Sequence, residues 1–343
     1  MQEAGFDLPY YRARVAALAE RGVFVGTSSW KYEGWLGQIY TPERYEYRGK
    51  VAKNRLEENC LAEYAETFRT VCVDAAFYQF FEEPKLREMA DQVPESFRFA
   101  FKTTEEITVK RWPALERYGA RGGTVNENFL NAGLFVDRFL GPLESIRKKV
   151  GPIILEFGKF HPSEYQSASH FIAELDRFLG NLPKTWLYSV ELRNRKWLGA
   201  EYLACLKKHG VAHVLNNWTD MPSVKEQLDL VKDQAIEEFT VARFLLKPGR
   251  KYEEAVQRFR PYKFTGEINE EARFALAQLI ERGWVKLSKD GSFIYINNRL
   301  EGNALLTVMG VLDQLEQMLQ VPRPAPAAMP APKPAQAQFD LGL

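Results

Sequence analysis

The chain of 343 residues is poor in cysteine and histidine, with three of the first and four of the second. Cys60, Cys72 and Cys205 lie far apart and form no Cys-x-x-Cys pair, so neither a disulfide framework nor a thiolate zinc site is indicated. The histidines show no ligand spacing at the end of an expected strand, which argues against a histidine-rich zinc site. We therefore interpret the cysteines as small buried hydrophobes of a reducing compartment.

Several signals that would define a function class are also missing. The net charge is +1, so composition makes no case for a nucleic-acid or membrane surface. No apolar run approaches the roughly 18 residues of a membrane span. Residues 1–9 lack a basic stretch followed by an apolar one, so we expect no secretory signal and a cytoplasmic location.

Motifs that bind nucleotides or activate a serine are absent as well. There is no Gly-x-x-x-x-Gly-Lys loop, no Gly-x-Gly-x-x-Gly and no Gly-x-Ser-x-Gly elbow. We expect no nucleotide cofactor, and a divalent metal held by carboxylates from Asp74, Glu156 and Glu191 is left open.

What the sequence does contain is a regular alternation of apolar runs and helical patterns. The expected strands are residues 23–26, 70–78, 97–102, 153–157, 186–193, 211–215, 239–246 and 293–297. The expected helices are residues 9–21, 56–68, 84–92, 127–140, 168–179, 200–209, 223–230, 270–282 and 304–319, with an irregular segment over 103–124. Eight strands joined by helical crossovers predict an α/β fold, a single (β/α)8 barrel of TIM type. A doubly wound open sheet is the alternative.

The pattern divides the chain into three parts. Residues 1–22 hold an extra N-terminal helix, residues 23–320 form the barrel, and residues 321–343 are a disordered Pro/Ala-rich tail. The tail ends in a short peptide that resembles the bacterial sliding-clamp-binding motif, made of Gln338, Phe339, Asp340, Leu341, Gly342 and Leu343. Such a peptide would recruit the protein to replication or repair DNA, and an arbitrary tail is the plainer interpretation.

Nearly every expected strand ends in a polar or charged residue. In a TIM-type barrel these ends meet at one rim, where the chemistry is located. The candidate catalytic residues are Asp74, Lys102, Glu156 and Glu191. The candidate ligand-binding residues are Ser28, Trp30, Tyr32, Trp35, Tyr78, Arg193, Trp197, Asn217, Arg243, Asn297 and Asn298. The aromatic residues after the first strand suit a pocket wall, because Trp and Tyr offer a flat apolar face with a polar tip.

Several of these residues also have a plainer interpretation, since Lys102 would emerge into solvent and Asp74 would cap a loop. Glu191 and Arg193 share an inward face and would form a structural ion pair. Trp30 and Trp35 would fill the core of a loop, and the asparagines after the last strand would serve a turn. Convergence of all these groups on one rim favours a ligand site.

Six ordered blocks resemble the family known as domain of unknown function 72, the YecE-like proteins. The first is Val-Gly-Thr-Ser-Ser-Trp-x-Tyr-x-x-Trp at 25–35, and the others lie at 70–78, 97–108, 151–155, 191–197 and 297–304. The resemblance implies a TIM-type barrel without an established reaction. It supports Trp30, Tyr32, Trp35, Tyr78, Lys102, Glu191, Arg193, Trp197, Asn297 and Asn298 as motif positions.

Three strand ends depart from the family pattern. Residues 156–160 stand in place of Gln-x-Pro-Pro, and Arg243 is followed by Phe-Leu-Leu in place of an Arg-x-His-Gly-like end. Asn216 and Asn217 stand near a position where Asp is common. These departures would fit a divergent subfamily with altered or lost activity.

The rim composition suggests the chemistry. Glu156 and Glu191 leave adjacent strands beside aromatic residues, an arrangement that suits a glycosidic or polyol substrate. The rim cations suit an anionic group such as phosphate; they are Lys102, Arg193, Arg243 and Arg299. We expect a hydrolase or isomerase that acts on a small polar, phosphorylated or sugar-like ligand. A repair-associated protein recruited to the sliding clamp and an inactive adaptor barrel are the alternatives, so whether the chain is an enzyme is left open.

A basic stretch in the irregular segment is a candidate contact to nucleic-acid phosphates. It contains Lys110, Arg111 and the cations within residues 117–121. A solvated lid loop is the plainer interpretation.

Overall fold

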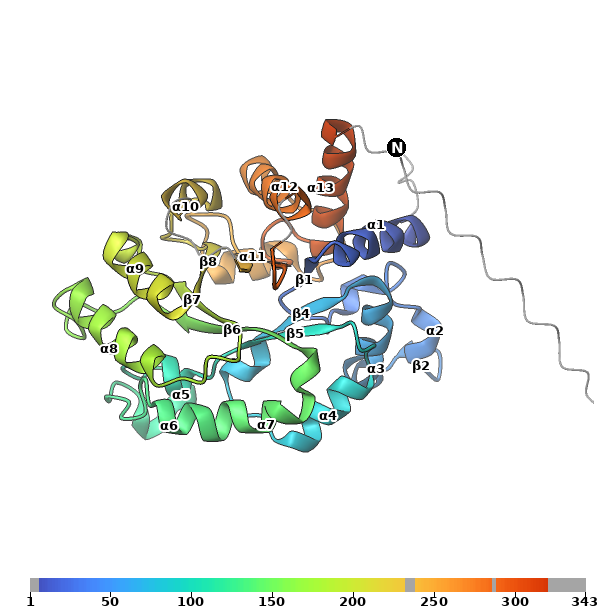
Figure 1. Ribbon diagram of the computed structural model, residues 1–343. Coiled ribbons are helices and arrows are strands. Elements are labelled where there is room, and N and C mark those ends of the chain that lie inside the picture. Colours follow the sequence, from blue (N-terminus) through green and yellow to red (C-terminus); the bar gives the residue numbers. More distant parts are fainter. Residues whose placement is uncertain (1–5, 232–237, 286–287, 320–343) are drawn as a thin grey trace, which may run out of the picture.

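The computed structural model describes residues 6–231, 238–285 and 288–319. Its eight long strands form a closed parallel barrel in the order β1-β10-β9-β8-β7-β6-β5-β4 (Figure 1). They are β1 (Val23–Thr27), β4 (Thr70–Val73), β5 (Arg98–Lys102), β6 (Val150–Phe157), β7 (Tyr188–Leu192), β8 (Ala212–Asn217), β9 (Thr240–Phe244) and β10 (Ser292–Ile296). The predicted TIM-type barrel is confirmed. The tail at 321–343, with its peptide, lies outside the described residues.

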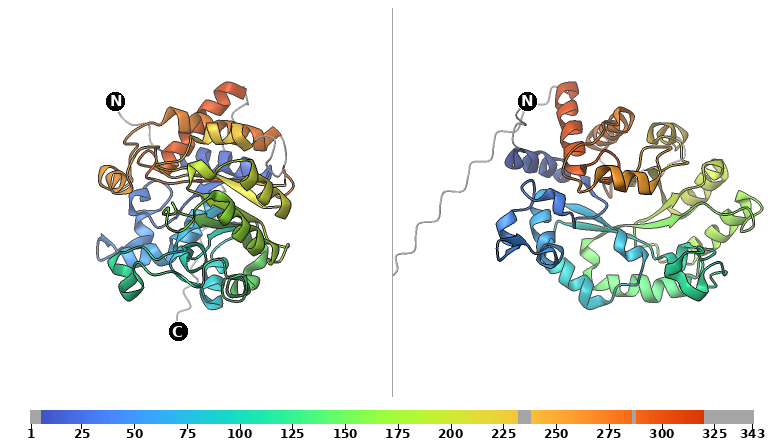
Figure 2. Two further views of the ribbon diagram at one scale, coloured as in Figure 1. Left: turned by 90° about the vertical axis from the view of Figure 1, so that its left-hand side faces the viewer. Right: turned by 180° about the vertical axis from the view of Figure 1, so that it is seen from behind.

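Helices surround the barrel in every view (Figure 2). The longer ones are α1 (Leu8–Glu20), α3 (Lys53–Thr67), α4 (Glu83–Asp91), α8 (Ala168–Gly180), α9 (Ala200–His209), α10 (Val224–Val231), α11 (Tyr252–Phe259), α12 (Glu270–Val285) and α13 (Ala304–Leu319). Short helices are α2 (Pro42–Tyr45), α5 (Glu105–Thr108), α6 (Ala132–Leu134) and α7 (Gly141–Leu143), and β2 (Glu46–Tyr47) pairs with β3 (Lys50–Val51). In the described part of the chain, no helix is long and apolar enough to cross a membrane.

The predicted helix before the first strand is present as α1, which packs between α3 and α13. The ring of Tyr11 meets that of Phe68 edge-on, with centroids 5.9 Å apart. Arg14 is buried and bonds to Asp313 at 2.6 Å and to Glu316 at 2.8 Å on α13. These contacts attach α1 to the end of α3 and to α13.

The barrel interior follows from the alternation of side chains along each strand. Its apolar filling comes from Cys72, Ala100, Ile154, Ala212, Val214, Phe239, Val241, Phe293 and Tyr295, with Phe24 and Leu187 beside them. The next inward position, two residues toward the C-terminal end, is charged on four of these strands or just after them. Because inward positions recur every second residue, the apolar layer inside the barrel is followed directly by a layer of charged side chains at the C-terminal rim.

Three local predictions were wrong. The second strand ends at Val73, because the chain turns into a 3₁₀ helix over Asp74–Phe77. The helix expected at 127–140 begins only at Ala132, where the Asn131 side chain accepts from the Leu134 amide at 3.0 Å. The segment 103–124 is less irregular than predicted, since it holds α5 and a 3₁₀ helix over Glu116–Arg121.

Helix α11 was not predicted at all. It has eight residues and buries only Ala255 and Phe259. Two inward apolar residues are too few to give a helical period that can be read from sequence.

Candidate functional site

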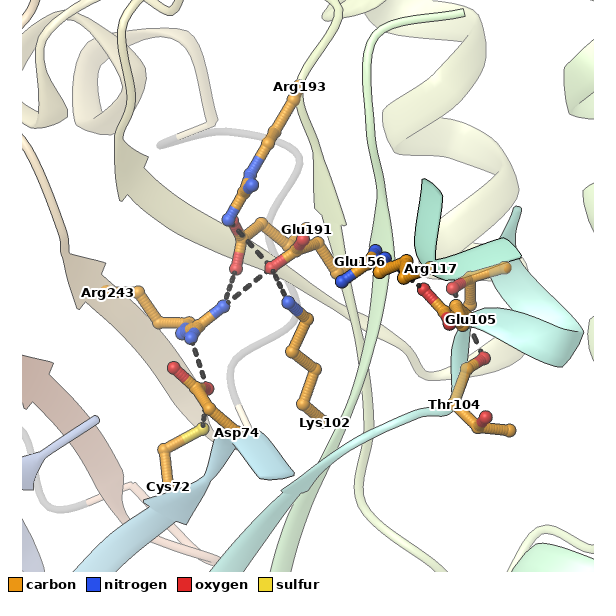
Figure 3. Close-up of polar contacts among 11 residues, drawn as sticks. Cys72, Asp74, Lys102, Thr104, Glu105, Arg117, Glu156, Glu191, Arg193 and Arg243 are labelled. Atoms are coloured by element: carbon orange, nitrogen blue, oxygen red, sulfur yellow. Dashed lines mark hydrogen bonds and ion pairs between the residues drawn. The ribbon is translucent and has the colours of Figure 1, made fainter. Parts of the chain in front are cut away.

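Six charged side chains meet at the C-terminal rim of the barrel, from five strands or the residues that follow them. This charged cluster consists of Asp74, Lys102, Glu156, Glu191, Arg193 and Arg243. It contains three carboxylates and three cations, so its formal charge is zero. Figure 3 shows the six side chains converging from different strands.

Arg243 lies at the centre of the charged cluster. Its Nη1 donates to Glu191 Oε2 at 2.6 Å and to Glu156 Oε2 at 2.9 Å, and its Nη2 donates to Asp74 Oδ1 at 2.5 Å. Burial alone would lower the pKa of Arg243, but the surrounding carboxylates raise it well above its usual value. Arg243 is thus a permanent positive charge that holds three carboxylates together.

Glu156 collects the cations. Its Oε2 accepts from Lys102 Nζ at 2.9 Å and from Arg193 Nη2 at 2.7 Å, besides Arg243. Burial would raise the pKa of Glu156, but the charges of Arg193, Lys102 and Arg243 outweigh it and lower the pKa from 4.5 to about 2. Glu156 therefore stays ionised near neutral pH and is poorly suited to carry a proton.

Glu191 and Arg193 form the ion pair that their spacing predicts. Arg193 Nε donates to Glu191 Oε1 at 2.8 Å, and Glu191 lies directly opposite Glu156 in the register of β6 and β7. The guanidinium of Arg193 also stacks on the ring of Trp218, 3.6 Å from its centroid. Glu191 is fully buried between two arginines.

Asp74 is the most open carboxylate of the charged cluster. Its side chain is 28% exposed, whereas those of Glu156 and Glu191 are 6% and 0% exposed. Arg243 and the Cys72 thiol both contact Oδ1, the latter at 3.3 Å. Within the described residues Oδ2 has no partner, so one carboxylate oxygen is available to a ligand.

The cluster is hard to explain by stability alone. Buried ion pairs pay a large desolvation cost, and well-packed hydrophobic residues in their place are often as stable or more so. Perturbed, buried titratable groups at the mouth of a barrel are typical of functional sites.

Several buried polar atoms near the rim also have no hydrogen-bond partner in the described part of the chain. They are Ser28 Oγ, Trp30 Nε1, Thr103 Oγ1, Asn216 Oδ1, Arg243 Nε, Asn298 Nδ2 and Arg299 Nε. Unpaired buried polar atoms are rare in folded proteins and mark places where water or a ligand binds.

The structure gives the predicted asparagines local partners. Asn217 Oδ1 accepts from the Val224 amide at 3.3 Å, at the start of α10. Asn298 Oδ1 accepts from the Ala304 amide at 2.7 Å, at the start of α13, and Asn297 Oδ1 accepts from the Arg299 amide at 3.0 Å. These contacts support the plainer interpretation of the asparagines as cap and turn residues.

The predicted aromatic residues lie outside the charged cluster. Trp35 is fully buried and stacks on Tyr64, with ring centroids 6.4 Å apart, and Trp30 is 7% exposed. Tyr78 is 60% exposed beside Arg117. The remaining two are Tyr32, which contacts Trp35 and Tyr262, and Trp197, which stacks on Phe160 and Phe171.

Sequence reasoning missed three residues that contact the charged cluster. Cys72 contacts Asp74, Phe77 lies under the Lys102 ammonium at 3.8 Å, and Trp218 lies under Arg193. A usable signal existed for Trp218, because it directly follows the end of β8 on the rim.

One group of potential metal ligands lies outside the rim. Asp176, Cys205 and His209 have ligand atoms within 4.8 Å of one another, on α8 and α9 outside the barrel. Lys208 already bonds both oxygens of Asp176, at 2.8 and 2.9 Å, so an ion there would have to displace it. In the charged cluster a divalent cation would have to displace lysine and arginine side chains.

The basic stretch of the 103–124 segment is largely neutralised. Lys110 bonds Glu174 at 3.0 Å, Arg117 bonds Glu105 at 3.2 Å and Arg121 bonds Glu106 at 3.3 Å. Figure 3 includes the Arg117–Glu105 pair. Paired cations of this kind offer little positive potential to a nucleic-acid backbone.

Comparison with known proteins places the chain in a family. The model of the family described as "Protein of unknown function DUF72" matches residues 24–334. The chain belongs to the DUF72 family. The resemblance predicted from the six sequence blocks is thereby confirmed. A comparison with curated proteins gives no match.

Solved structures of other DUF72 proteins share the fold. One from Enterococcus faecalis is 16% identical over 87% of this chain and 96% of its own, with a TM-score of 0.55. One from Thermotoga maritima is 18% identical over 87% of this chain and 99% of its own, with a TM-score of 0.54. A third structure, SacUVDE, is 13% identical over 87% and 98%, with a TM-score of 0.44. At these identities the two DUF72 structures show a shared barrel and nothing about the reaction.

Proposed function

We propose that the chain is a hydrolase or isomerase that acts on a small polar ligand by carboxylate acid–base chemistry at the C-terminal rim. The observation that supports this most is the charged cluster. Five of its six side chains are 11% exposed or less, yet all six come together where TIM-type barrels carry their active sites.

In this proposal Asp74 is the proton carrier. Its Oδ2, which has no partner among the described residues, and its partial exposure allow it to reach a ligand, while Arg243 fixes the other oxygen. Glu156, with its low pKa, holds cations in place and does not exchange protons. We therefore assign to Asp74 the acid–base role that the sequence led us to expect of Glu156 and Glu191.

Lys102 and Arg193 form the electrostatic part of the site. Each side chain is 11% exposed, and each is anchored both by Glu156 and by an aromatic face. Cations held in place before the reaction stabilise negative charge that develops in a transition state, because no reorganisation is then needed.

The test uses wild type and Asp74→Asn, each incubated with a small-molecule extract of cells and followed by mass spectrometry. We expect wild type to deplete at least one metabolite and to form its product, and Asp74→Asn to do so at least about 100-fold more slowly. Glu83→Gln, which removes an exposed carboxylate paired with Arg87 on α4, is the matched control and should behave like wild type. Absence of any metabolite change with wild type would favour the inactive adaptor barrel.

A second proposal rests on the terminal peptide alone. We propose that residues 338–343 recruit the chain to the bacterial sliding clamp, because the peptide combines Gln, Asp and apolar residues in the order of that motif. A pull-down should retain the clamp with the full chain and lose it when residues 338–343 are deleted. Equal retention by both proteins would contradict the proposal.

A further inference from the structure

The first strand brings an unpaired hydroxyl into the mouth of the barrel. Phe24 belongs to the apolar interior, so the alternation of side chains turns Gly26 and Ser28 inward too. The amide of Ser28 donates to the carbonyl of Ile296 at 3.1 Å, which fixes Ser28 beside the end of β10. Its Oγ is buried, at 1% exposure, and has no partner among the described residues.

Arg299 follows the end of β10 and differs from the cations of the charged cluster. Lys102, Arg193 and Arg243 each contact a carboxylate, but Arg299 contacts none in the described part of the chain. Its guanidinium packs on the ring of Tyr252, 4.6 Å from the centroid, and its buried Nε is unpaired. Arg299 is therefore a positive charge at the rim without a counter-ion in the described residues.

Tyr32 lies in the same segment as Ser28, directly after β1. Burial raises the pKa of Tyr32 to about 12, while Arg299 lowers it and Asp74 raises it. The hydroxyl of Tyr32 also shares a side-chain hydrogen bond with Ser29. Its ring is held edge-on by Tyr262, with centroids 5.6 Å apart, so its position is fixed by packing.

We infer that Ser28, Tyr32 and Arg299 form an anion subsite that binds the phosphate group of the substrate. The inference rests on the proposed function and narrows the substrate class to small phosphorylated molecules. Ser28 and Tyr32 supply hydroxyl donors, and Arg299 supplies a charge-assisted one. Asp74 lies on the neighbouring side, where it would face the reacting part of the same molecule.

The charged cluster itself is less suited to the phosphate. Its three cations are matched by three carboxylates, and an anion there would have to compete with Glu156 for Lys102 and Arg193. At the subsite beside β1 and β10, Ser28 Oγ is unpaired and Arg299 has no counter-ion within the described residues, so an anion there would displace no carboxylate.

The experiment is calorimetric titration of the full chain with inorganic phosphate at constant ionic strength. We expect binding by wild type, weakening of about tenfold or more in Arg299→Gln and of about fivefold in Ser28→Ala. Ser28→Ala removes only an unpaired hydroxyl, so its melting temperature should equal or exceed that of wild type. Arg258→Gln, which removes a half-exposed arginine of α11, is the matched charge control and should bind phosphate like wild type.

Asp74→Asn separates this inference from the proposed function. It should retain phosphate binding while turnover is lost. Phosphate binding that is unchanged in both Arg299→Gln and Ser28→Ala would overturn the subsite, even if Asp74→Asn has lost turnover. Failure of wild type to bind phosphate would overturn it as well. Phosphate affinity that is lost in Lys102→Met but unchanged in Arg299→Gln would also overturn it.

Discussion

The substitution Glu156→Gln tests the electrostatic description of the charged cluster most quantitatively. Gln has the shape of a protonated glutamic acid but cannot become negative, so three cations would face a neutral amide. The pKa of Glu156 falls from 4.5 to about 2 in the folded chain. Since one pKa unit corresponds to about 1.4 kcal/mol, the ionised carboxylate stabilises the fold by about 3 kcal/mol at neutral pH.

The same shift gives a pH dependence with a definite sign. The pKa of Glu156 is lower in the folded chain than in the unfolded one, so its contribution is complete above pH 4.5 and is lost as the pH falls toward 2. The difference in unfolding free energy between wild type and Glu156→Gln should therefore shrink from about 3 kcal/mol at pH 7 to about 1 kcal/mol at pH 3.

Urea denaturation of both proteins at the two pH values measures this difference. Glu83→Gln provides the control, because its exposed pair with Arg87 should change stability by only about 0.5 kcal/mol. Equal stability of Glu156→Gln and wild type at pH 7, or a difference that is the same at pH 3, would refute the reasoning.

Three further predictions concern other parts of the molecule. Burial lowers the pKa of His213 from 6.5 to about 4, so its ring protons should titrate near pH 4 by NMR, and stability should fall as the pH drops from 6.5 to 4; a midpoint at 6.5 would contradict this. Gly34→Ala would place a Cβ 2.1 Å from the carbonyl oxygen of Pro261, so urea unfolding should show a loss of about 3 kcal/mol, and no loss would disprove the close approach. Trp218→Leu removes the face on which Arg193 stacks, so substrate KM should rise about threefold or more at little cost in stability, and an unchanged KM would exclude a positioning role for this ring.

Much of the fold could be predicted because burial leaves a period in the sequence. Alternating strands and helices predicted the barrel, the strand ends placed Glu156 and Glu191 on adjacent strands of the rim, and the period of two paired Glu191 with Arg193. The turn at Asp74 could not be foreseen, because an apolar stretch before Phe77 resembles a continued strand. In the structure a 3₁₀ helix begins at Asp74, whose side chain accepts a hydrogen bond from Arg243 on a distant strand.

The candidate site was harder to predict in detail because one residue type serves several purposes. Asn217 and Asn298 have the chemistry of ligand-binding residues, and only the structure shows that both accept from a nearby helix-end amide. Similarly, the sequence cannot tell which of two glutamates gathers the cations. That choice depends on how Lys102 and Arg193 reach across from neighbouring strands to Glu156.

The central claim is that the charged cluster serves function and not stability, and replacing all six charges at once tests it most directly. The variant combines Asp74→Leu, Lys102→Met, Glu156→Met, Glu191→Met, Arg193→Met and Arg243→Met. Hydrophobic side chains of similar size avoid the desolvation cost of the buried charges, so the variant should unfold at a urea concentration at least equal to that of wild type. It should also turn over none of the metabolites that wild type consumes. A folded variant that still turns them over, or a variant that cannot fold, would contradict the account.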